Sequence, residues 1–366
     1  MPDRSIDLHP LLVRAMLRLR CTYYFLMRRV RVRVRPGFKR MDGLRREFYA
    51  SIWRRAAETT GAHFRILPDG VAEIQRNGHR ISVSVNATSL NGSMALRLAE
   101  SKATVHSVLA RSGIPVPKQI VVGADEFEQA LQMLRSSRLP LVVKPYAYTG
   151  GGEGVSTNIA TASQLRAAFA WACSFEGHSV IEEQVEGDCY RVLVMDGKVL
   201  DTIVRHPPTV TADGASTVAQ LIRRENNLRL EAGMTRAHTL IGRDPDLRNT
   251  LASQGLSLRS CPARGQTVVL KRVINENSGR ENVSANGRLC SAILETACKA
   301  AEVVGARLAG VDVICRDPSV PLERSGGAII EINGTPGFYY HYAAESAFPV
   351  ADEVLNRFFD LAAHQQ

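Results

Sequence analysis

The sequence lacks the features that mark membrane-spanning, disulfide-bonded and zinc-binding proteins. None of its 366 residues lies in a run approaching the roughly 20 apolar residues of a membrane span. The N-terminus also lacks the shape of a cleavable signal peptide. The 7 cysteines are odd in number, scattered and never spaced as CxxC, which argues against disulfides and zinc sites. These absences predict a cytoplasmic protein.

Dedicated nucleic-acid modules are also missing. The sequence contains no helix-turn-helix, no zinc-finger spacing and no aromatic set suited to base stacking, and aromatic residues make up only 6% of it. No GK[ST] triplet follows a glycine-rich loop, which excludes a Walker A site. The composition is globular, with 45% hydrophobic and 22% charged residues.

The net positive charge of the chain comes entirely from its first sixth. Residues 1–60 hold 15 Arg and Lys against 5 Asp and Glu, which accounts for the whole net charge of +10. Within this arm, residues 29–35 (RVRVRVR) predict a strand with one arginine face. Three interpretations stay open: a structural or homodimer-forming extension, a surface for an acidic substrate or partner, or a nucleic-acid or membrane contact.

Hydrophobic periodicity predicts an α/β fold without internal repeats. We expect helices over residues 8–27, 44–61, 93–112, 125–137, 162–176, 287–305 and 349–363. Strands are expected to begin near residue 119 and to cover 63–67, 71–76, 80–85, 140–145, 179–185, 190–195, 198–205, 309–315 and 328–332. The predicted division is a basic arm (1–40), a small N-terminal domain (41–118), a small lobe (119–187) and a C-terminal lobe (188–366).

The last two predicted strands carry acids. Asp312 lies in the first strand, and Glu331 and Asn333 lie two residues apart in the second, so the latter two share a face. Carboxylate and amide oxygens are ligands that Mg²⁺ takes alongside phosphate oxygens. The alternative is a core strand whose acids are paired elsewhere, because acids rarely stay uncompensated inside apolar strands.

A phosphate site is predicted upstream. The apolar strand LVVKP ends near Lys144 and leads into the glycine-rich residues 148–155 (YTGGGEGV). Glycine lets backbone N–H groups approach an anion closely, and a lysine at the strand end adds a point charge. A flexible turn without a ligand is the alternative for this loop.

Two further stretches carry candidate residues. The strand 179–185 ends in acids and could offer main-chain groups to a purine, although a charged edge strand explains it equally well. Arg205 and Arg272 follow apolar strands, and arginine suits the charge that develops on a transferring phosphoryl group or an oxyanion. A surface location is the alternative for either arginine.

Taken in order, these pieces resemble the ATP-grasp superfamily over roughly residues 95–355. The resemblance is carried by VVKP with the glycine loop, GDCYRVLVMDGK (187–198), RHPP (205–208), DGASTVAQLI (213–222), AGVDVI (309–314) and GGAIIEINGTPG (326–337). It is greatest to the ATP-grasp domain of cyanophycin synthetases, with D-alanine–D-alanine ligases and glutathione synthetases more distant. It implies a fold of two α+β lobes that hold nucleotide between them.

The resemblance also implies roles for single residues. The residues implied to bind ATP are Lys102, Lys144, Thr149, Gly150, Gly151, Gly152, Gly154, Glu182, Glu183, Val185 and Asp188, with 149–154 closing as a lid. Asp312, Glu331 and Asn333 would bind Mg²⁺, with Mn²⁺ as a substitute. Arg205, Arg272 and Asn333 would be catalytic.

The sequence departs from the family pattern at two places. Cys189 stands where the family has an acid, and the acid lies one place earlier, at Asp188. Residues 275–280 read NENSGR where cyanophycin synthetases have NLSTGG. The resemblance implies an ATP-dependent ligase that joins a small-molecule carboxylate, of an amino acid or small peptide, to an amine through an acyl phosphate. A kinase-like phosphotransferase and a nucleotide-binding module without chemistry are the alternatives.

Overall fold

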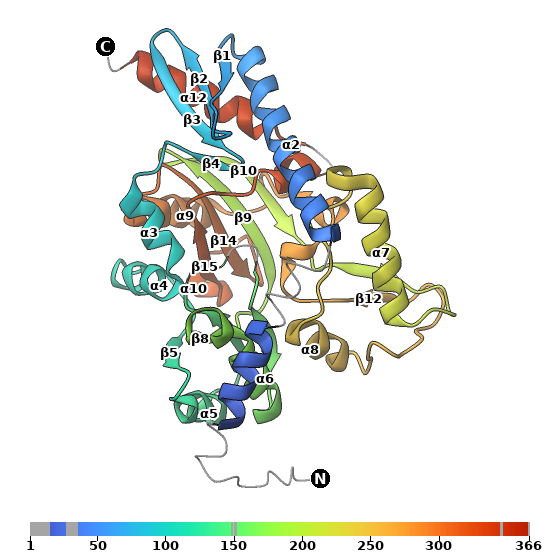
Figure 1. Ribbon diagram of the computed structural model, residues 1–366. Coiled ribbons are helices and arrows are strands. Elements are labelled where there is room, and N and C mark those ends of the chain that lie inside the picture. Colours follow the sequence, from blue (N-terminus) through green and yellow to red (C-terminus); the bar gives the residue numbers. More distant parts are fainter. Residues whose placement is uncertain (1–14, 27–35, 148, 150–151, 345–346, 365–366) are drawn as a thin grey trace.

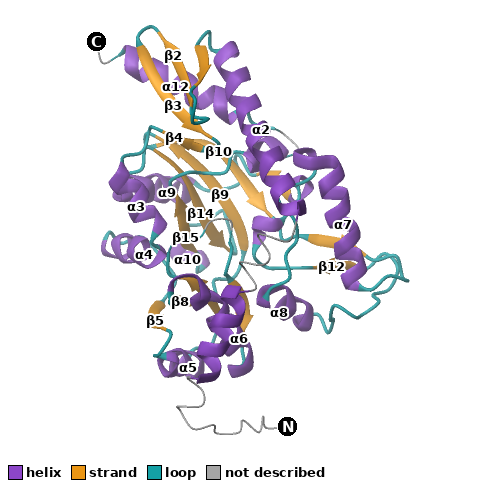
Figure 2. Cartoon of the chain, in the orientation of Figure 1, coloured by secondary structure: helices purple, strands orange, loops and turns teal. Residues whose placement is uncertain are grey.

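A computed structural model describes residues 15–26, 36–147, 149, 152–344 and 347–364 (Figures 1 and 2). Besides a helix over 15–26, its helices are α2 Pro36–Thr59, α3 Ser93–Glu100, α4 Lys102–Arg111, α5 Phe127–Ser136, α6 Ala162–Glu176, α7 Val218–Ala232, α8 Pro245–Ser253, α9 Ser291–Val304, α10 Leu322–Ser325, α11 Tyr339–Ala343 and α12 Val350–Ala363. Its strands are β1 His63–Ile66, β2 Ala72–Arg76, β3 His79–Ser84, β4 Ala87–Thr88, β5 Gln119–Gly123, β6 Leu141–Pro145, β7 Ser156–Ile159, β8 His178–Glu183, β9 Asp188–Met195, β10 Lys198–Arg205, β11 Thr209–Thr211, β12 Thr267–Val269, β13 Asn282–Ser284, β14 Leu308–Cys315 and β15 Ala328–Asn333.

The centre of the molecule is a five-stranded antiparallel sheet in the order β13-β10-β9-β14-β15. Apolar side chains alternate along its middle strands, and those on one face pack against α9 to form the largest hydrophobic core. Tyr190, Val192 and Val194 of β9 belong to this core. Because neighbouring residues in a strand point to opposite faces, Cys189 and Arg191 point to the face away from α9.

The small lobe is a second antiparallel sheet, in the order β5-β8-β6-β7. Helices α5 and α6 pack on it, and the helix over 15–26 joins the same core through Leu17. This helix confirms part of the predicted helix over 8–27. The predicted arginine strand over 29–35 lies outside the described residues.

A third sheet, β1-β2-β3-β4, packs against α2 and α12 at the top of Figure 1, so the C-terminal helix lies beside the segment over residues 36–88. Asn77 and Gly78 form the hairpin turn between β2 and β3, and both have positive φ (51° and 83°) as a tight hairpin requires. Helix α2 extends from this sheet towards the centre of the molecule.

The segment between β10 and β13 was not resolved into elements by sequence reasoning. It forms another lobe, distinct from the small lobe, from α7, α8 and the two-stranded sheet β11-β12, with a separate hydrophobic core. The two strands have three residues each, which is too few for periodicity to be recognised; helix α7, with 15 residues, was also not predicted.

The predicted helix over 93–112 is wrong in one respect, because it is broken at Ser101. Ser101 has an extended backbone (φ −99°, ψ 101°), and its hydroxyl caps the second helix by accepting from the Thr104 N–H. Lys102 therefore begins α4 instead of lying inside one long helix.

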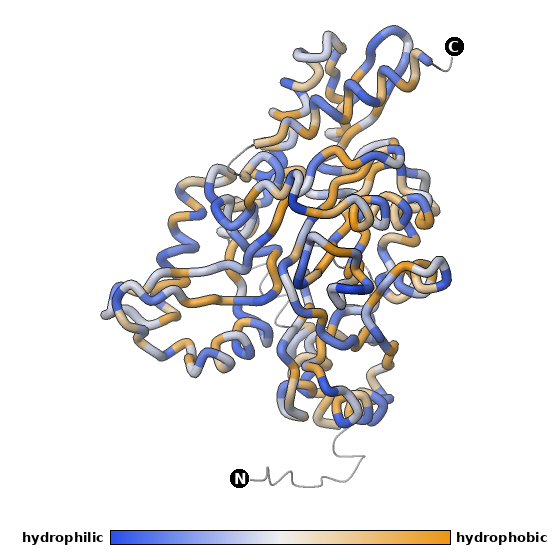
Figure 3. The backbone as a smooth tube through the Cα atoms, turned by 180° about the vertical axis from the view of Figure 1, so that it is seen from behind, coloured by the Kyte–Doolittle hydropathy of each residue, from blue (hydrophilic) through white to orange (hydrophobic). Residues whose placement is uncertain are grey.

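None of the described helices is long and apolar enough to cross a membrane, and hydrophobic and hydrophilic stretches alternate along the chain (Figure 3).

Candidate active site

The face of the central sheet opposite α9 presents a row of charged side chains. Asp312 of β14 lies directly opposite Glu331 of β15 and directly opposite Arg191 of β9. Asn333 follows Glu331 on the same face, and Arg205 ends β10 opposite Cys189. Strand pairing alone thus gathers two acids, an amide and two arginines.

Asp312 is the centre of this row. Both of its oxygens accept from Arg191, Nε to Oδ1 at 2.5 Å and Nη2 to Oδ2 at 2.9 Å, and Arg205 Nη1 lies 3.7 Å from Oδ1. Burial opposes ionisation of Asp312, but the charge and hydrogen bonds of Arg191 outweigh it and lower the pKa. Gly310 leaves the room for this pair, because a Cβ there would lie 2.9 Å from Arg191 Nη1. Asp312 is therefore a carboxylate at neutral pH.

Two buried lysines lie where the small lobe meets this face. Lys102 Nζ is 3.5 Å from Glu331 Oε1 and donates to the carbonyl of Thr149 at 3.5 Å. Lys144 Nζ is 2.5 Å from Glu182 Oε1, and both side chains are almost fully buried. Among the described residues, each lysine thus has one acidic partner, which holds its side chain in place.

Arg205 leads into a cluster of polar and aromatic side chains. Its guanidinium carbon lies 4.0 Å from the ring centre of Tyr340, and its Nη2 donates to Asn275 Oδ1 at 2.6 Å. The Tyr340 hydroxyl lies 3.2 Å from His238 Nε2. Burial, together with the charges of Arg205 and Arg229, lowers the pKa of His238 to about 3. A neutral imidazole therefore stands beside the arginine.

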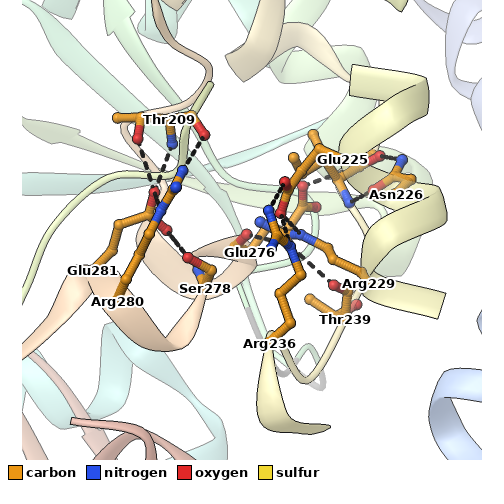
Figure 4. Close-up of polar contacts among 12 residues, drawn as sticks. Thr209, Glu225, Asn226, Arg229, Arg236, Thr239, Glu276, Ser278, Arg280 and Glu281 are labelled. Carbon is orange, nitrogen blue, oxygen red and sulfur yellow. Dashed lines mark hydrogen bonds and ion pairs between the residues drawn. The ribbon is translucent and has the colours of Figure 1, made fainter. Parts of the chain in front are cut away.

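A buried network fixes the segments that carry His238 and Asn275 (Figure 4). Arg229 of α7 is 1% exposed and donates to the carbonyls of Thr239 and Glu276 at 3.0 and 2.7 Å. Glu225, one turn earlier, accepts from both Arg229 and Arg236. Because these carbonyls directly follow His238 and Asn275, helix α7 positions both side chains.

The end of the same segment is fixed by Glu281. One carboxylate oxygen accepts from the N–H and hydroxyl of Thr209, both at 2.9 Å, and the other accepts from the N–H and hydroxyl of Ser278. Figure 4 shows Glu281 between these two residues. With both ends bonded, residues 275–280 form a defined wall although they contain no long helix or strand.

These side chains surround a cavity of about 760 Å³. The central sheet contributes Arg191, Glu331 and Asn333 to its lining, and α11 contributes Tyr340. The segments held by α7 contribute His238 and Asn275, and α2 contributes Phe38, Arg45 and Tyr49. Glu153 and Trp171 line it from the small lobe. The cavity thus extends from the acid row to α2, and cationic and aromatic side chains line it.

The architecture matches a known fold. The bifunctional glutathione synthetase from Pasteurella multocida superposes with a TM-score of 0.52 at 23% identity, covering 82% of this chain and 41% of that one. The chain has an ATP-grasp fold.

Sequence comparison points the same way. The cyanophycin synthetase of Trichormus variabilis is 30% identical over 276 residues, which is 74% of this chain and 30% of that protein. The glutathione biosynthesis bifunctional protein of Listeria welshimeri is 30% identical over 282 residues, 75% of this chain and 35% of that protein. No family model matches the sequence. The chain spans about a third of the length of these relatives. The predicted resemblance and the predicted ATP-grasp fold are confirmed.

The residues of the acid row fit a divalent cation of the magnesium type. Asp312 and Glu331 face each other across paired strands, and Asn333 adds an amide. This set supplies only oxygen atoms, as Mg²⁺ prefers. Among the described residues no group of three or more His, Cys, Asp and Glu side chains is arranged as a metal site.

Several of the predicted ATP-binding residues lie on the small lobe or where it meets the central sheet. Lys144 of β6 forms an ion pair with Glu182 of β8, Glu183 and Val185 lie where β8 leads into β9, and Lys102 begins α4 near Glu331. Of the predicted lid, Thr149, Gly152 and Gly154 are described, while Gly150 and Gly151 lie outside the described residues. A Cβ on Gly154 would lie 2.3 Å from Pro145 Cγ, so only glycine fits there.

Two predicted site residues are not brought to the site. Asp188 is exposed and points to the other face of β9 from Cys189, because neighbouring residues alternate. Cys189 shares the face of Arg191, and burial and the charge of Asp312 raise its pKa to about 12. Arg272 is exposed, and it is Lys271 that is buried, between Asp244 and Glu276 at 2.6 and 2.7 Å.

Sequence reasoning did not assign roles to Arg191, His238, Tyr340 or Arg45. The period-two pattern of β9 places Arg191 in line with Asp312 only when the register of the two strands is known. His238 and Tyr340 lie in segments without periodicity, and Arg45 reaches the cavity from α2, which sequence reasoning placed in a separate domain. A signal existed only for Arg191, an arginine inside an otherwise apolar strand.

Proposed function

We propose that the chain is an ATP-dependent carboxylate–amine ligase that forms an amide or peptide bond through an acyl phosphate. The observation that carries this proposal is the row Asp312, Glu331 and Asn333, of which Glu331 and Asn333 line a 760 Å³ cavity, with Arg205 near Asp312 and the buried Lys102 near Glu331. Relatives named as glutathione and cyanophycin synthetases support it.

The charges of the cleft suit a triphosphate. Lys102 and Lys144 each have a single acidic partner, which phosphate oxygens would replace or share. Asp312, Glu331 and Asn333 would hold Mg²⁺, or Mn²⁺ in its place, which neutralises charge on the transferring phosphoryl group. Arg205 lies 3.7 Å from Asp312 and is aimed at the same region, where it would stabilise charge on the transferred group and on the acyl phosphate. Positioning and charge neutralisation are then the main catalytic contributions.

The rest of the cavity would hold the carboxylate substrate and the amine. An amine nucleophile must lose a proton, and His238 is the neutral base that lines the cavity. Its pKa of about 3 is set by burial and by Arg205 and Arg229. Anionic phosphates bound at Arg205 would offset part of that repulsion and raise the pKa towards the working range of a general base.

The test is a screen of the purified chain with ATP, Mg²⁺ and pairs of small carboxylates and amines, followed by phosphate release and by mass spectrometry of products. A ligase requires both organic substrates and yields ADP, phosphate and a product heavier by condensation. A phosphorylated product formed without an amine would show a kinase instead. Binding of ATP without turnover for any pair would contradict catalysis.

Glu331→Gln tests the metal assignment. The substitution removes one ligand charge while keeping the shape, so turnover should fall by roughly 100-fold or more, because several kcal/mol of transition-state stabilisation depend on the metal. Glu323→Gln is the matched control, because Glu323 is exposed on α10 of the same lobe. Normal turnover in a folded Glu331→Gln protein would exclude the assignment.

A further inference from the structure

The helix over residues 15–26 carries a second apolar face that no described residue covers. Leu17 is buried in the small-lobe core, with Cys21 and Tyr24 against it, and Tyr24 packs edge-on to Trp171 of α6 at 5.2 Å between ring centres. The exposed apolar stripe of this helix is Met16, Leu19, Tyr23 and Leu26, which are 45%, 71%, 57% and 55% exposed. The helix is the dark blue one beside α6 in Figure 1.

The spacing puts the exposed apolar stripe opposite the packed side. Residues 16, 19, 23 and 26 recur at helical intervals of three and four, so they lie along one side of the helix. Leu17, Cys21 and Tyr24 recur in the same way on the other side. The helix is therefore held flat on the protein by one face while the other faces outward along its whole length.

The surroundings of the stripe are basic. Tyr23 also lines a small cavity of about 160 Å³, whose charged lining residues are Arg243 and Asp244, just before α8, and Arg248 within α8. Arg20 is exposed on the helix itself. The first 60 residues, to which the helix belongs, hold the entire net charge of +10.

From this geometry we propose that the helix over 15–26 docks the enzyme onto an anionic lipid bilayer surface. A helix with leucine, methionine and tyrosine on one side and arginines around it lies in the plane of a membrane interface, with its apolar side chains below the headgroups. The arginines then meet the lipid phosphates. A second copy of the chain fits less well, because two arms of the same strong positive charge would have to meet face to face.

The experiment is co-sedimentation of the full chain with vesicles of phosphatidylcholine alone and of phosphatidylcholine with phosphatidylglycerol, at low and high salt. The chain should sediment with the anionic vesicles and much less with the neutral ones. Leu19→Glu should weaken that binding by roughly tenfold or more, the loss expected when one leucine no longer leaves water. Leu26→Glu should behave in the same way.

Leu139→Glu is the matched control, because Leu139 is 41% exposed on the same lobe and away from the helix. It should bind vesicles as the unaltered chain does. Equal binding to neutral and anionic vesicles, or unchanged binding of Leu19→Glu, would overturn the proposal. A dimer in light scattering that Leu19→Glu dissociates would overturn it in favour of an interface between copies.

Discussion

Replacing Arg191 with methionine tests the electrostatics of the acid row most directly. Methionine keeps much of the arginine's volume and removes both hydrogen bonds to Asp312, at 2.5 and 2.9 Å. The carboxylate stays buried, with Arg205 at 3.7 Å and the Asn333 amide nitrogen at 3.4 Å still near it. Breaking a buried pair in this way costs about 3–5 kcal/mol, because it leaves an uncompensated charge. With Arg205 still in place, we expect a loss near the lower end, about 3 kcal/mol.

The loss of stability in Arg191→Met should also change with pH, in a direction that follows from the pKa of Asp312. In the unaltered chain the pKa of Asp312 lies below that of an aspartate in the unfolded chain, so the pair contributes stability above the unfolded-state pKa and loses it as pH falls through the lowered pKa. In Arg191→Met, burial dominates and raises the pKa of Asp312, so protonation relieves the buried charge on acidification. The difference in stability between the two proteins should therefore shrink from pH 7 to pH 4.5.

Urea unfolding followed by circular dichroism at the two pH values measures both effects. The matched control is Arg316→Met, which breaks an exposed ion pair with Glu186 and should cost less than about 1 kcal/mol at either pH. A loss for Arg191→Met as small as that of the control, or a loss that does not change with pH, would refute the reasoning. Restoring the lost stability with Asp312→Asn in the same chain would support it.

Two further predictions concern the walls of the cavity. Gly152→Ala should lower turnover while stability changes by less than about 2 kcal/mol, because φ is +69° and a Cβ would lie 2.5 Å from Asn275 Nδ2; Gly43→Ala, with nothing within 4 Å of its Cβ, is the control, and equal kinetics of the two variants would contradict it. Glu225→Gln should destabilise the chain by roughly 2–4 kcal/mol at pH 7. Burial opposes ionisation of Glu225, but the hydrogen bonds from Arg236 and Arg229 lower its pKa, so the cost should diminish once pH falls below that pKa. A calorimetric melting temperature equal to that of the unaltered chain would rule this out.

The fold could be predicted where periodicity is strong. The strands around Asp312 and Glu331 and the helices α6, α9 and α12 were predicted within a few residues, because each buries one regular apolar face. The lobe of α7, α8, β11 and β12 could not be predicted in this way. Its hydrophobic core is assembled from short segments, and hydrogen bonds between distant segments, such as those of Arg229 with Thr239 and Glu276, leave no periodic signal.

The same distinction applies to the candidate site. Asp312, Glu331 and Asn333 were predicted to lie together because two strands place them on one face. Arg272 was chosen over Lys271 because both follow an apolar strand, and the sequence does not reveal which of two neighbours turns inward. The structure shows Lys271 turned inward to Asp244 and Glu276. Asp188 points away from the candidate site for a similar reason. Neighbouring residues of a strand point to opposite faces, and the family resemblance alone does not tell which face Asp188 occupies.

The two lobes that frame the cleft are tied together by one buried carboxylate. Asp246 of α8 accepts from the N–H and hydroxyl of Thr157 on β7 with one oxygen, at 2.8 and 2.7 Å. The other oxygen accepts from the N–H groups of Arg272 and Val273 at 3.1 Å. Val273 is also the residue beside which Gly152 packs. Asp246 therefore joins the strand after the glycine loop to the segment that carries Asn275. Any opening of the glycine loop that moves β7 must break hydrogen bonds that also hold the wall of the substrate cavity. The structure thus links the glycine loop to the wall of the cavity through α8, a helix that was not predicted from the sequence.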